Sequence, residues 1–585
     1  METNPYGSFA SPKENVYAKC FNGRKNEIFI EDWWLSPELY LRRPPAHNDN
    51  ENYRLDKLLL KKATEGVKIY IVLYDENPKV LYLNSRYAES TLMKHPNIIV
   101  FRHAENNFWS TVEWGFNKLW NGVFPSADSV KHPEIDPDSF WSKIVVIDRH
   151  TAFIGGLDLC FGRYDTHVHS LTDFPTFAKL SEVWPGQDYN NVRIKDFEEV
   201  QKWKNVLISK EISARMPWHD ISIGFNVGII LNPEKQEITL SIPFLKEAAT
   251  DESPGVIRTY KYFNETAEVD SLKGTCSVQI LRSASKWSHG IELEALVKRI
   301  IKAHKLQEKF RVIVVMPLIP GFEGQFDEES ESSTVLRLTM DFQYRSICRG
   351  DDKCDDSIWG QLKKADINPE DYISFYGLRT YAKIDSEAIK KAKINLQIYI
   401  HSKLMIVDDQ IVICGSANLN DRSQIGKHDS EIAAIIKDTD EINSKLAGKS
   451  FKASKFAVSL RRHLFKEHLG LLQDSEHEKD PVSDGFFKLW RGIAEENTKI
   501  YDEVFHCLPS DNVKTQSDYE NFAPKPNKGH LVLFPYDFLK GAETITFHKI
   551  KTLKDLKDDF GEAKLSVEDG LIEDLTGSSL SAAFK

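Results

Sequence analysis

The feature that most constrains the fold of this 585-residue chain is a motif that occurs twice. Each copy has a lysine, an aspartate five residues later and a glycine seven residues after the aspartate. The two copies consist of Lys143, Asp148 and Gly155, and of Lys403, Asp408 and Gly415. Such a repeat is hard to obtain from composition alone. It therefore predicts two similar half-domains that each contribute one motif to a shared site.

Both copies read as two short apolar strands around a polar turn, at residues 148–150 and 408–410. Helices that alternate with apolar strands predict the α/β class, here as two pseudo-symmetric α/β sandwich halves with the active site at their interface. Upstream of the motifs we expect a helix and then a strand, at residues 58–66 and 68–73 in one half and at residues 296–304 and 311–316 in the other.

The repeat also divides the chain into segments. We expect a first half at residues 1–225, a divergent connector at 226–275, a second half at 276–475 and a C-terminal helical and closing segment at 476–585.

The second copy carries residue types that suit a phosphodiester. His401 and Lys403 are two residues apart on a strand-like segment, so their side chains point to the same side. Imidazole can attack phosphorus or transfer a proton near neutral pH, while an ammonium group neutralises charge on phosphoryl oxygens. The step from Gly415 to Ser416 lets the backbone approach an anion closely, and the Asn418 amide can donate hydrogen bonds to it.

With residues 30–45, 155–165, 215–220 and 371–379, the motif copies make the chain resemble the phospholipase D superfamily. The resemblance is specifically to the eukaryotic phospholipases D that hydrolyse phosphatidylcholine. It implies two His-x-Lys-x4-Asp motifs, in which the first histidine forms a phosphohistidine. The second protonates the leaving alcohol and then activates water or another alcohol. Phosphatidic acid and choline would be the products, with no metal or other cofactor in the chemistry and with phosphoinositide as an activator.

The resemblance also assigns roles to individual residues. Asp148 and Asp408 open tight turns, so we expect them to hold their lysines or loops. Asp158 and Asn418 are candidates for contacting phosphate, and Asp173 and Glu431 for orienting the histidines. The catalytic set is Lys143, Asp148, His401, Lys403 and Asp408, and the phosphate-binding or supporting set is Gly156, Asp158, Asp173, Ser416, Asn418 and Glu431.

The first motif departs from this pattern. Trp141 stands two residues before Lys143, where a histidine is expected. An indole cannot accept a phosphoryl group or transfer a proton at neutral pH. Either a substitution or a short deletion explains it. We favour a deletion, because family members often read Phe-Trp-Ser followed by His-His-x-Lys, whereas Ser142 here adjoins Lys143 directly. A transcript that encodes Trp-Ser-Lys with nothing inserted would exclude a faulty gene model.

Other segments also look short. The strand at residues 27–34 has no evident counterpart between Trp287 and Leu296, and residues 19–25 leave no room for the helix expected before Asn26. Because several segments are missing, our hypothesis is a mis-spliced gene model or an inactive isoform. The alternative to an enzyme is therefore a catalytically dead relative that binds phospholipid headgroups or a partner.

Composition limits the partners. A third possible function is that of a nuclease. The formal net charge of −11 argues against it and against any nucleic-acid partner, because a negatively charged protein repels a polyanion. The seven cysteines are scattered without disulfide or zinc spacing, which predicts a reducing intracellular compartment. Without a signal peptide or a membrane-spanning run, we expect a cytoplasmic monomer that reaches phospholipid at a membrane surface peripherally, with regulatory proteins as further partners.

Overall fold

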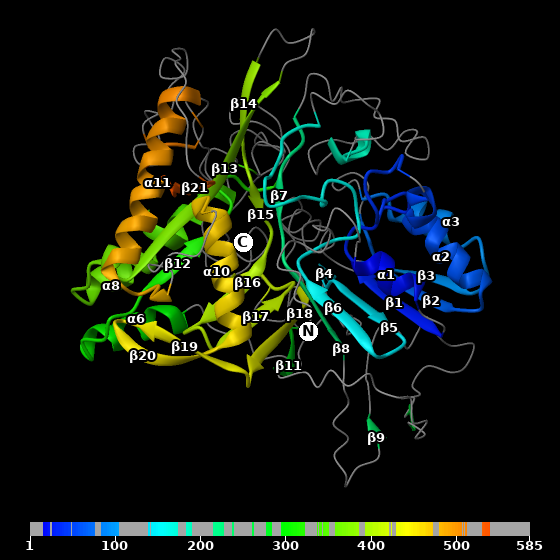
Figure 1. Ribbon diagram of the computed structural model, residues 1–585, viewed down its shortest axis with the longest axis horizontal. Coiled ribbons are helices and arrows are strands. Elements are labelled where there is room, and N and C mark those ends of the chain that lie inside the picture. Colours follow the sequence, from blue (N-terminus) through cyan, green and yellow to red (C-terminus); the bar gives the residue numbers. More distant parts are fainter. Residues whose placement is uncertain are drawn as a thin grey trace, which may run out of the picture.

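The computed structural model has a mixed α/β fold (Figure 1). It describes residues 16–23, 26–47, 49–76, 83–104, 139–140, 142–173, 183–189, 214–226, 237–238, 260–261, 276–283, 294–321, 336, 339–341, 343–349, 357–384, 392–420, 423, 429–471, 479–505, 507, 509–511 and 529–538.

A six-stranded sheet forms the first half, drawn in blue and cyan in Figure 1. Its first three strands in space are parallel, and the motif hairpin joins them antiparallel. Alternate residues are buried on the strands at Glu27–Asp32 and Ile144–Ile147, and the apolar core on this side of the sheet includes residues of helices α1–α3. In spatial order the strands are β3 (Ile98–Ala104), β2 (Lys68–Asp75), β1 (Glu27–Asp32), β5 (Ile144–Ile147), β6 (Thr151–Gly155) and β8 (Ser222–Asn226). The helices are α1 (Val16–Asn22), α2 (Leu55–Thr64) and α3 (Ser85–Leu92).

Two sheets form the second half. One has the order β11 (Cys276–Ser283), β18 (Asp429–Asp438), β17 (Ile411–Gly415) and β16 (Lys403–Val407). The other contains β12 (Val312–Val315), β13 (Ile373–Ile384), β14 (Ala392–Gln397) and β21 (Leu531–Leu533). The helices are α6 (Glu294–Lys305), α8 (Ile358–Lys364), α10 (Lys455–Leu469) and α11 (Asp484–Phe505). Two short ladders pair β9 (Glu237–Ile238) with β10 (Tyr260–Lys261), and β19 (Glu441–Leu446) with β20 (Lys449–Ser454).

The strand orders of the two halves correspond, with one interruption. Strands β5, β6 and β8 correspond to β16, β17 and β18, and β2 after α2 corresponds to β12 after α6. Among the described residues, no strand of the second half occupies the place of β1, and β12 and β16 belong to separate sheets. The break agrees with the short sequence between Trp287 and Leu296.

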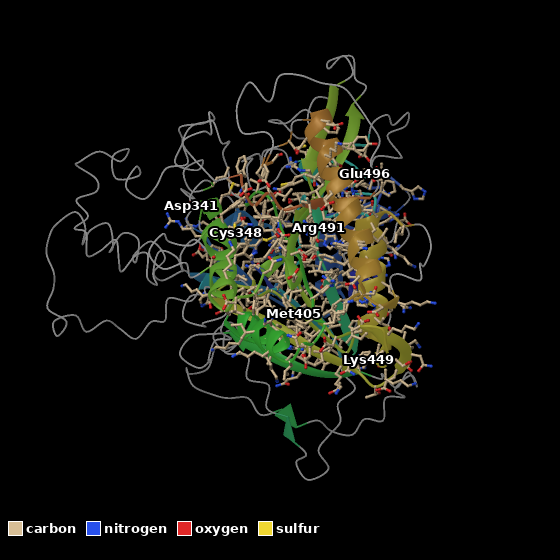
Figure 2. The ribbon with its side chains drawn as sticks, turned by 90° about the vertical axis from the view of Figure 1, so that its left-hand side faces the viewer. Asp341, Cys348, Met405, Lys449, Arg491 and Glu496 are labelled. Carbon is tan, nitrogen blue, oxygen red and sulfur yellow. The ribbon has the colours of Figure 1, made fainter. Side chains whose placement is uncertain are left out.

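The interruption changes the burial of the motif strands. On β5, Val145 and Ile147 are 5% and 0% exposed, because β1 lies beside them. The corresponding side chains on β16 are Met405 and Val407, and they are 38% and 37% exposed. Met405 is labelled in Figure 2, which views the side of the molecule formed by the second half. The second motif therefore lies on an edge strand, whereas the first lies inside a sheet.

Backbone pairing joins the two halves. β15 (Tyr399–Ile400) runs parallel to β7 (Trp218–His219), and β4 (Ser139–Phe140) runs parallel to the start of β18. An apolar core shared by β6, β8, β17, β18 and α10 lies beneath this junction. The motif hairpins thus come together through two cross-half strand pairs.

Most expected elements are present. The helices expected at 58–66 and 296–304 and the strands that follow them are α2, β2, α6 and β12. Both motif turns have two consecutive residues with φ near +50°, as a tight hairpin turn requires. The expectation that residues 19–25 leave no room for a helix was wrong, since α1 covers much of this segment.

Candidate active site

The two motif lysines lie at corresponding ends of their hairpins, where Lys143 is buried and Lys403 is half-buried between the halves. Lys143 Nζ is 3.3 Å from Asp158 Oδ1, and Lys403 Nζ donates a 2.7 Å hydrogen bond to His401 O. Burial and the neighbouring charge of Lys143 lower the pKa of Lys403 to about 7, although Asp220 opposes them. Two cations are therefore close enough to repel each other, which favours an anion between them.

A glycine lets the motif copies approach. A Cβ atom on Gly156 would lie 2.5 Å from Asp220 Oδ1 and 2.7 Å from His401 O. A Cβ atom essentially never lies that close to another heavy atom, so a side chain at this position would push the copies apart. Gly156 therefore belongs to the junction of the two motif copies, and its expected place in the phosphate-binding or supporting set stays a prediction.

His401 is held by a carboxylate of the other half. Its Nδ1 is 2.9 Å from Asp220 Oδ2, and its ring lies 4.9 Å from that of Trp218. Burial and then Lys403 lower the pKa of His401 to about 4, although Asp220 raises it. The imidazole is therefore neutral near pH 7, and the bond to Asp220 leaves Nε2 as the nitrogen that can react.

Glu431 corresponds to Asp220, because each precedes the isoleucine whose carbonyl lies against the motif glycine. Glu431 accepts hydrogen bonds from Ser416 Oγ (2.5 Å) and Ser423 Oγ (2.7 Å). Burial raises the pKa of the Glu431 carboxyl, although Lys143 opposes this shift. The carboxylate of the second half thus faces the lysine of the first, as Asp220 of the first half faces His401.

The same correspondence defines the position of Trp141 in the sequence. Phe140 pairs with Ser430 as Ile400 pairs with His219, and the next residues are Trp141 and His401. The Oγ atoms of Ser142 and Ser402 then donate equivalent bonds of 3.0 and 3.1 Å to the carbonyls of Ser430 and His219. Trp141 lies outside the described residues; in the sequence it stands between Phe140 and Ser142, as His401 stands between Ile400 and Ser402.

Carboxyl groups crowd the first half of the site. Asp158 lies between Lys143 and Arg163, 3.2 Å from Arg163 Nη2, and these cations lower its pKa against the effect of burial. Burial and Asp158 raise the pKa of Asp32 well above its usual range. Burial also raises the pKa of Glu31 to about 7, although a hydrogen bond with Ser142 opposes it. Each carboxylate oxygen of Asp158 thus has a cation nearby, Lys143 at 3.3 Å from Oδ1 and Arg163 at 3.2 Å from Oδ2.

Several expected residues lie elsewhere. Asp148 and Asp408 are at the hairpin turns, at the opposite ends of their strands from the lysines, and Asp148 Oδ1 accepts the backbone N–H groups of Asn26 and Glu27. The carboxylate of Asp173 accepts the N–H groups of Val183 and Trp184, so it holds a loop. Asn418 is exposed, while Ser416 is buried against Glu431.

Sequence reasoning missed two residues of the site, Asp220 and Arg163. It considered Asp173 and Glu431 as partners of the histidines, but His401 bonds to Asp220 from the other half. An acidic residue followed by isoleucine occurs both at 220–221 and at 431–432, but also at 27–28, 237–238 and 441–442, so this dipeptide alone would not have identified Asp220.

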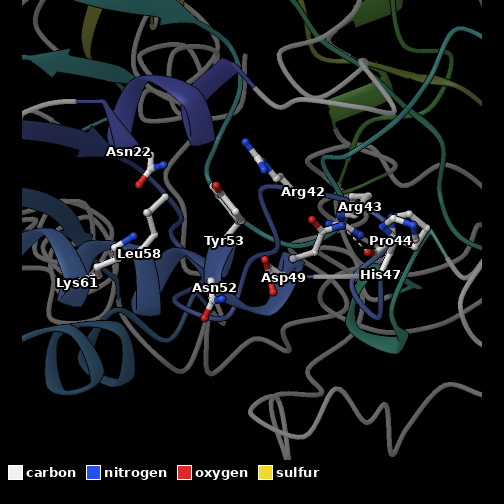
Figure 3. Close-up of a pocket in the computed structure, with 11 residues that line it drawn as sticks. Asn22, Arg42, Arg43, Pro44, His47, Asp49, Asn52, Tyr53, Leu58 and Lys61 are labelled. Carbon is white, nitrogen blue, oxygen red and sulfur yellow. Dashed lines mark hydrogen bonds between the residues drawn. The ribbon is translucent and has the colours of Figure 1, made fainter.

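A separate cavity of about 850 Å³ lies beside α2 (Figure 3). Its polar lining includes Arg42, Tyr53 and Lys61, and the Arg42 guanidinium lies 3.6 Å from the Tyr53 ring centre. Neither Lys143 nor His401 lines it. The motif site and this cavity are therefore different places.

A family model for phospholipase D matches residues 20–293 and 284–558. The chain belongs to the phospholipase D family. Phospholipase D2 of Bos taurus is 33% identical over 92% of this chain and 64% of its own length. Phospholipase D1 of Cricetulus griseus is 30% identical over 92% of this chain and 66% of its length. Phospholipase D zeta 2 of Arabidopsis thaliana is 31% identical over 84% of this chain and 56% of its own length.

The phospholipase D relatives are longer than this chain, which spans less than two thirds of each of these three. The alignment with the Bos taurus protein is 643 positions long but covers only 92% of the 585 residues of this chain. Some residues of the Bos taurus protein therefore have no counterpart in this chain. This agrees with the shortened segments. Within the described part of the chain, no helix combines the length and apolar character needed to span a membrane.

Proposed function

We propose that this chain hydrolyses phosphatidylcholine to phosphatidic acid and choline through a phosphohistidine intermediate. The observation that carries the proposal is the convergence of Lys143, His401 and Lys403 between the halves. Two ammonium groups can bind phosphoryl oxygens while one imidazole reacts at phosphorus. Membership of the phospholipase D family supports this reaction class.

We assign the attack on phosphorus to His401. Asp220 holds Nδ1, so Nε2 carries the lone pair, and a pKa of about 4 keeps that lone pair free of a proton at neutral pH. A bond forms between Nε2 and phosphorus while the bond from phosphorus to the choline oxygen breaks. This reverses the role that the resemblance implied for the second histidine, because no imidazole stands at position 141.

Lys403 supplies the proton for the choline oxygen. Its pKa of about 7 lets the ammonium form release a proton near neutrality. The resulting amine then accepts a proton from the water, or from the alcohol, that cleaves the phosphohistidine. The pKa of Lys143 is raised despite its burial, mainly by Asp158, so Lys143 stays charged and binds the phosphoryl oxygens.

Trp141 favours a second candidate, a relative that binds phospholipid headgroups, or a partner, without cleaving them. Such a protein needs the lysines but no proton transfer at position 141. Its binding to phosphatidylcholine vesicles should depend on Lys143 and persist without turnover.

Transphosphatidylation distinguishes the candidates. The chain is incubated with phosphatidylcholine vesicles and a short primary alcohol, and phosphatidyl alcohol is measured. We expect product that is lost in His401→Ala and retained in His150→Ala, whose histidine lies at the first motif turn. Absence of product with vesicle binding that requires Lys143 would overturn the proposal in favour of binding alone. Cleavage of single-stranded nucleic acid that is lost in His401→Ala would instead support a nuclease.

A further inference from the structure

Four histidines gather around Glu467 beside the second motif. Glu467 Oε1 lies 3.0 Å from His169 Nε2 and 3.3 Å from His219 Nε2. The His468 ring is 5.6 Å from the ring of His219, and the His530 ring is 5.3 Å from that of His169. The corresponding position to His219 in the second half is Ser430, so the cluster is not part of the duplicated motif.

The imidazole of His468 makes no hydrogen bond within the described part of the chain. Its side chain is buried, with the residue 6% exposed, and neither ring nitrogen has a hydrogen-bond partner there. A buried polar atom without a partner costs about 1–3 kcal/mol, so native proteins rarely leave one without a reason. Imidazole nitrogens beside a carboxylate are a typical donor set for a metal ion.

We propose that His219, Glu467 and His468 bind a divalent transition-metal ion, with Zn²⁺ as the best match. One ligand atom from each residue lies within 4.8 Å of the others. Tetrahedral zinc ligands at about 2.0–2.1 Å are about 3.3 Å from one another, which is the distance from His219 Nε2 to Glu467 Oε1. Side-chain rotation of His468 would close the remaining gap. Two imidazoles and one carboxylate favour zinc over calcium or magnesium and leave a fourth position for water.

The helix that carries two of the ligands favours a cation. Glu467 and His468 lie in the last turn of α10, which ends at Leu469 and has Gly470, with a φ of 65°, as its C-cap. The C-terminal end of a helix dipole carries partial negative charge, although the carbonyl groups of Glu467 and His468 here accept the backbone N–H groups of Gly470 and His530. The helix end and the Glu467 carboxylate would therefore both attract a cation at this place.

The ion would position the motif without touching phosphate. His219 Nδ1 is 2.8 Å from Ser402 Oγ, and His219 O accepts the backbone N–H of His401 at 2.8 Å. His219 also precedes Asp220, which holds the His401 ring. Binding would therefore fix β7 to α10, and through His219 it would hold the groups that position His401. It does not depend on the chain being catalytically active, and it adds no metal to the chemistry.

The competing occupant is a proton. His169 already contacts Glu467 Oε1, and protonated imidazoles could balance the carboxylate without any metal. In that case His468 remains an unpaired polar group. Its replacement by an apolar residue should then leave stability unchanged or raise it. If His468 is a metal ligand, the same replacement should lower stability only when metal is present.

The test is a titration of the full chain with Zn²⁺ alone after removal of metals by a chelator. We expect one bound ion per chain with a micromolar or tighter Kd, at least about 100-fold weaker binding in His468→Leu, and unchanged binding in the matched variant His150→Leu. Zn²⁺ should raise the Tm of the unaltered chain and of His150→Leu but not of His468→Leu. Equal binding by all three proteins, or no binding, would overturn the proposal.

A second measurement covers the case in which His468→Leu does not fold. X-ray absorption of the zinc-loaded, unaltered chain should show nitrogen and oxygen ligands at about 2.0–2.1 Å, with the outer scattering of two imidazoles. A shell of sulfur ligands at about 2.3 Å would instead assign the ion to cysteines and refute the site.

Discussion

Replacement of Trp141 by histidine should restore a proton-transferring group and raise phosphodiester hydrolysis. Position 141 corresponds to His401 in the cross-half strand pairing, and Glu431 corresponds to Asp220. Since His401 Nδ1 lies 2.9 Å from Asp220, an imidazole at position 141 should reach Glu431 at a similar distance. It would then stand opposite His401 across the two lysines.

The magnitude follows from the role of that group. A positioned general acid contributes about 10²- to 10⁴-fold to a rate, which is about 3–5 kcal/mol of the barrier. In the unaltered chain we assign this proton to Lys403, which must also bind phosphate. Trp141→His should therefore increase the rate of phosphatidyl alcohol formation by about two orders of magnitude or more.

The assay is transphosphatidylation with phosphatidylcholine vesicles and a short primary alcohol. Trp141→Gln is the matched control, because glutamine removes the indole and has a side chain similar in size to histidine but cannot titrate. Tm values of both variants would show that they fold equally well. The reasoning is refuted if Trp141→His and Trp141→Gln have the same rate, or if the gain survives the addition of His401→Ala.

Three further predictions concern stability. Gly156→Ala should lower the free energy of unfolding in urea by about 1–3 kcal/mol, because its Cβ would overlap Asp220 and His401; Gly492→Ala in α11, where nothing lies within 4 Å, should be neutral or stabilising. Val145→Thr on buried β5 should cost about 1–3 kcal/mol, whereas Val407→Thr on exposed β16 should stay within about 0.5 kcal/mol, and equal costs would contradict the sheet interruption. The folded protein releases the Lys403 proton near pH 7, whereas the unfolded chain keeps it to about pH 10.5. The free energy of unfolding, relative to that of Lys403→Met, should therefore rise with pH across that window. A flat or falling difference in denaturant titrations would argue against a lowered Lys403 pKa.

Local pattern was enough to predict much of the fold. The helices α2 and α6, the strands after them and both motif hairpins are encoded by short-range periodicity and turn residues, so they can be read without tertiary contacts. The shortened sequence before Leu296 also indicated where a strand is lacking, and the second-half sheet is interrupted at the corresponding place.

The partners of the site residues could not be predicted in the same way. Asp220 and His401 are 181 residues apart, and Glu431 and Lys143 are also on different halves. Sequence spacing pointed instead to Asp173, whose carboxylate holds a loop. Which carboxylate meets which base depends on how β7 pairs with β15 and β4 with β18, and such long-range pairing leaves no short-range signal.

By itself, the sequence determined that the chain is a duplicated α/β protein of the phospholipase D family whose first motif has tryptophan in place of histidine. Only the tertiary structure decided that each half lends its carboxylate to the other and that four histidines gather around Glu467. The reason is physical. Periodicity and motifs act over a few residues, whereas desolvation and the pairing of buried charges depend on groups that meet only when the halves pack together.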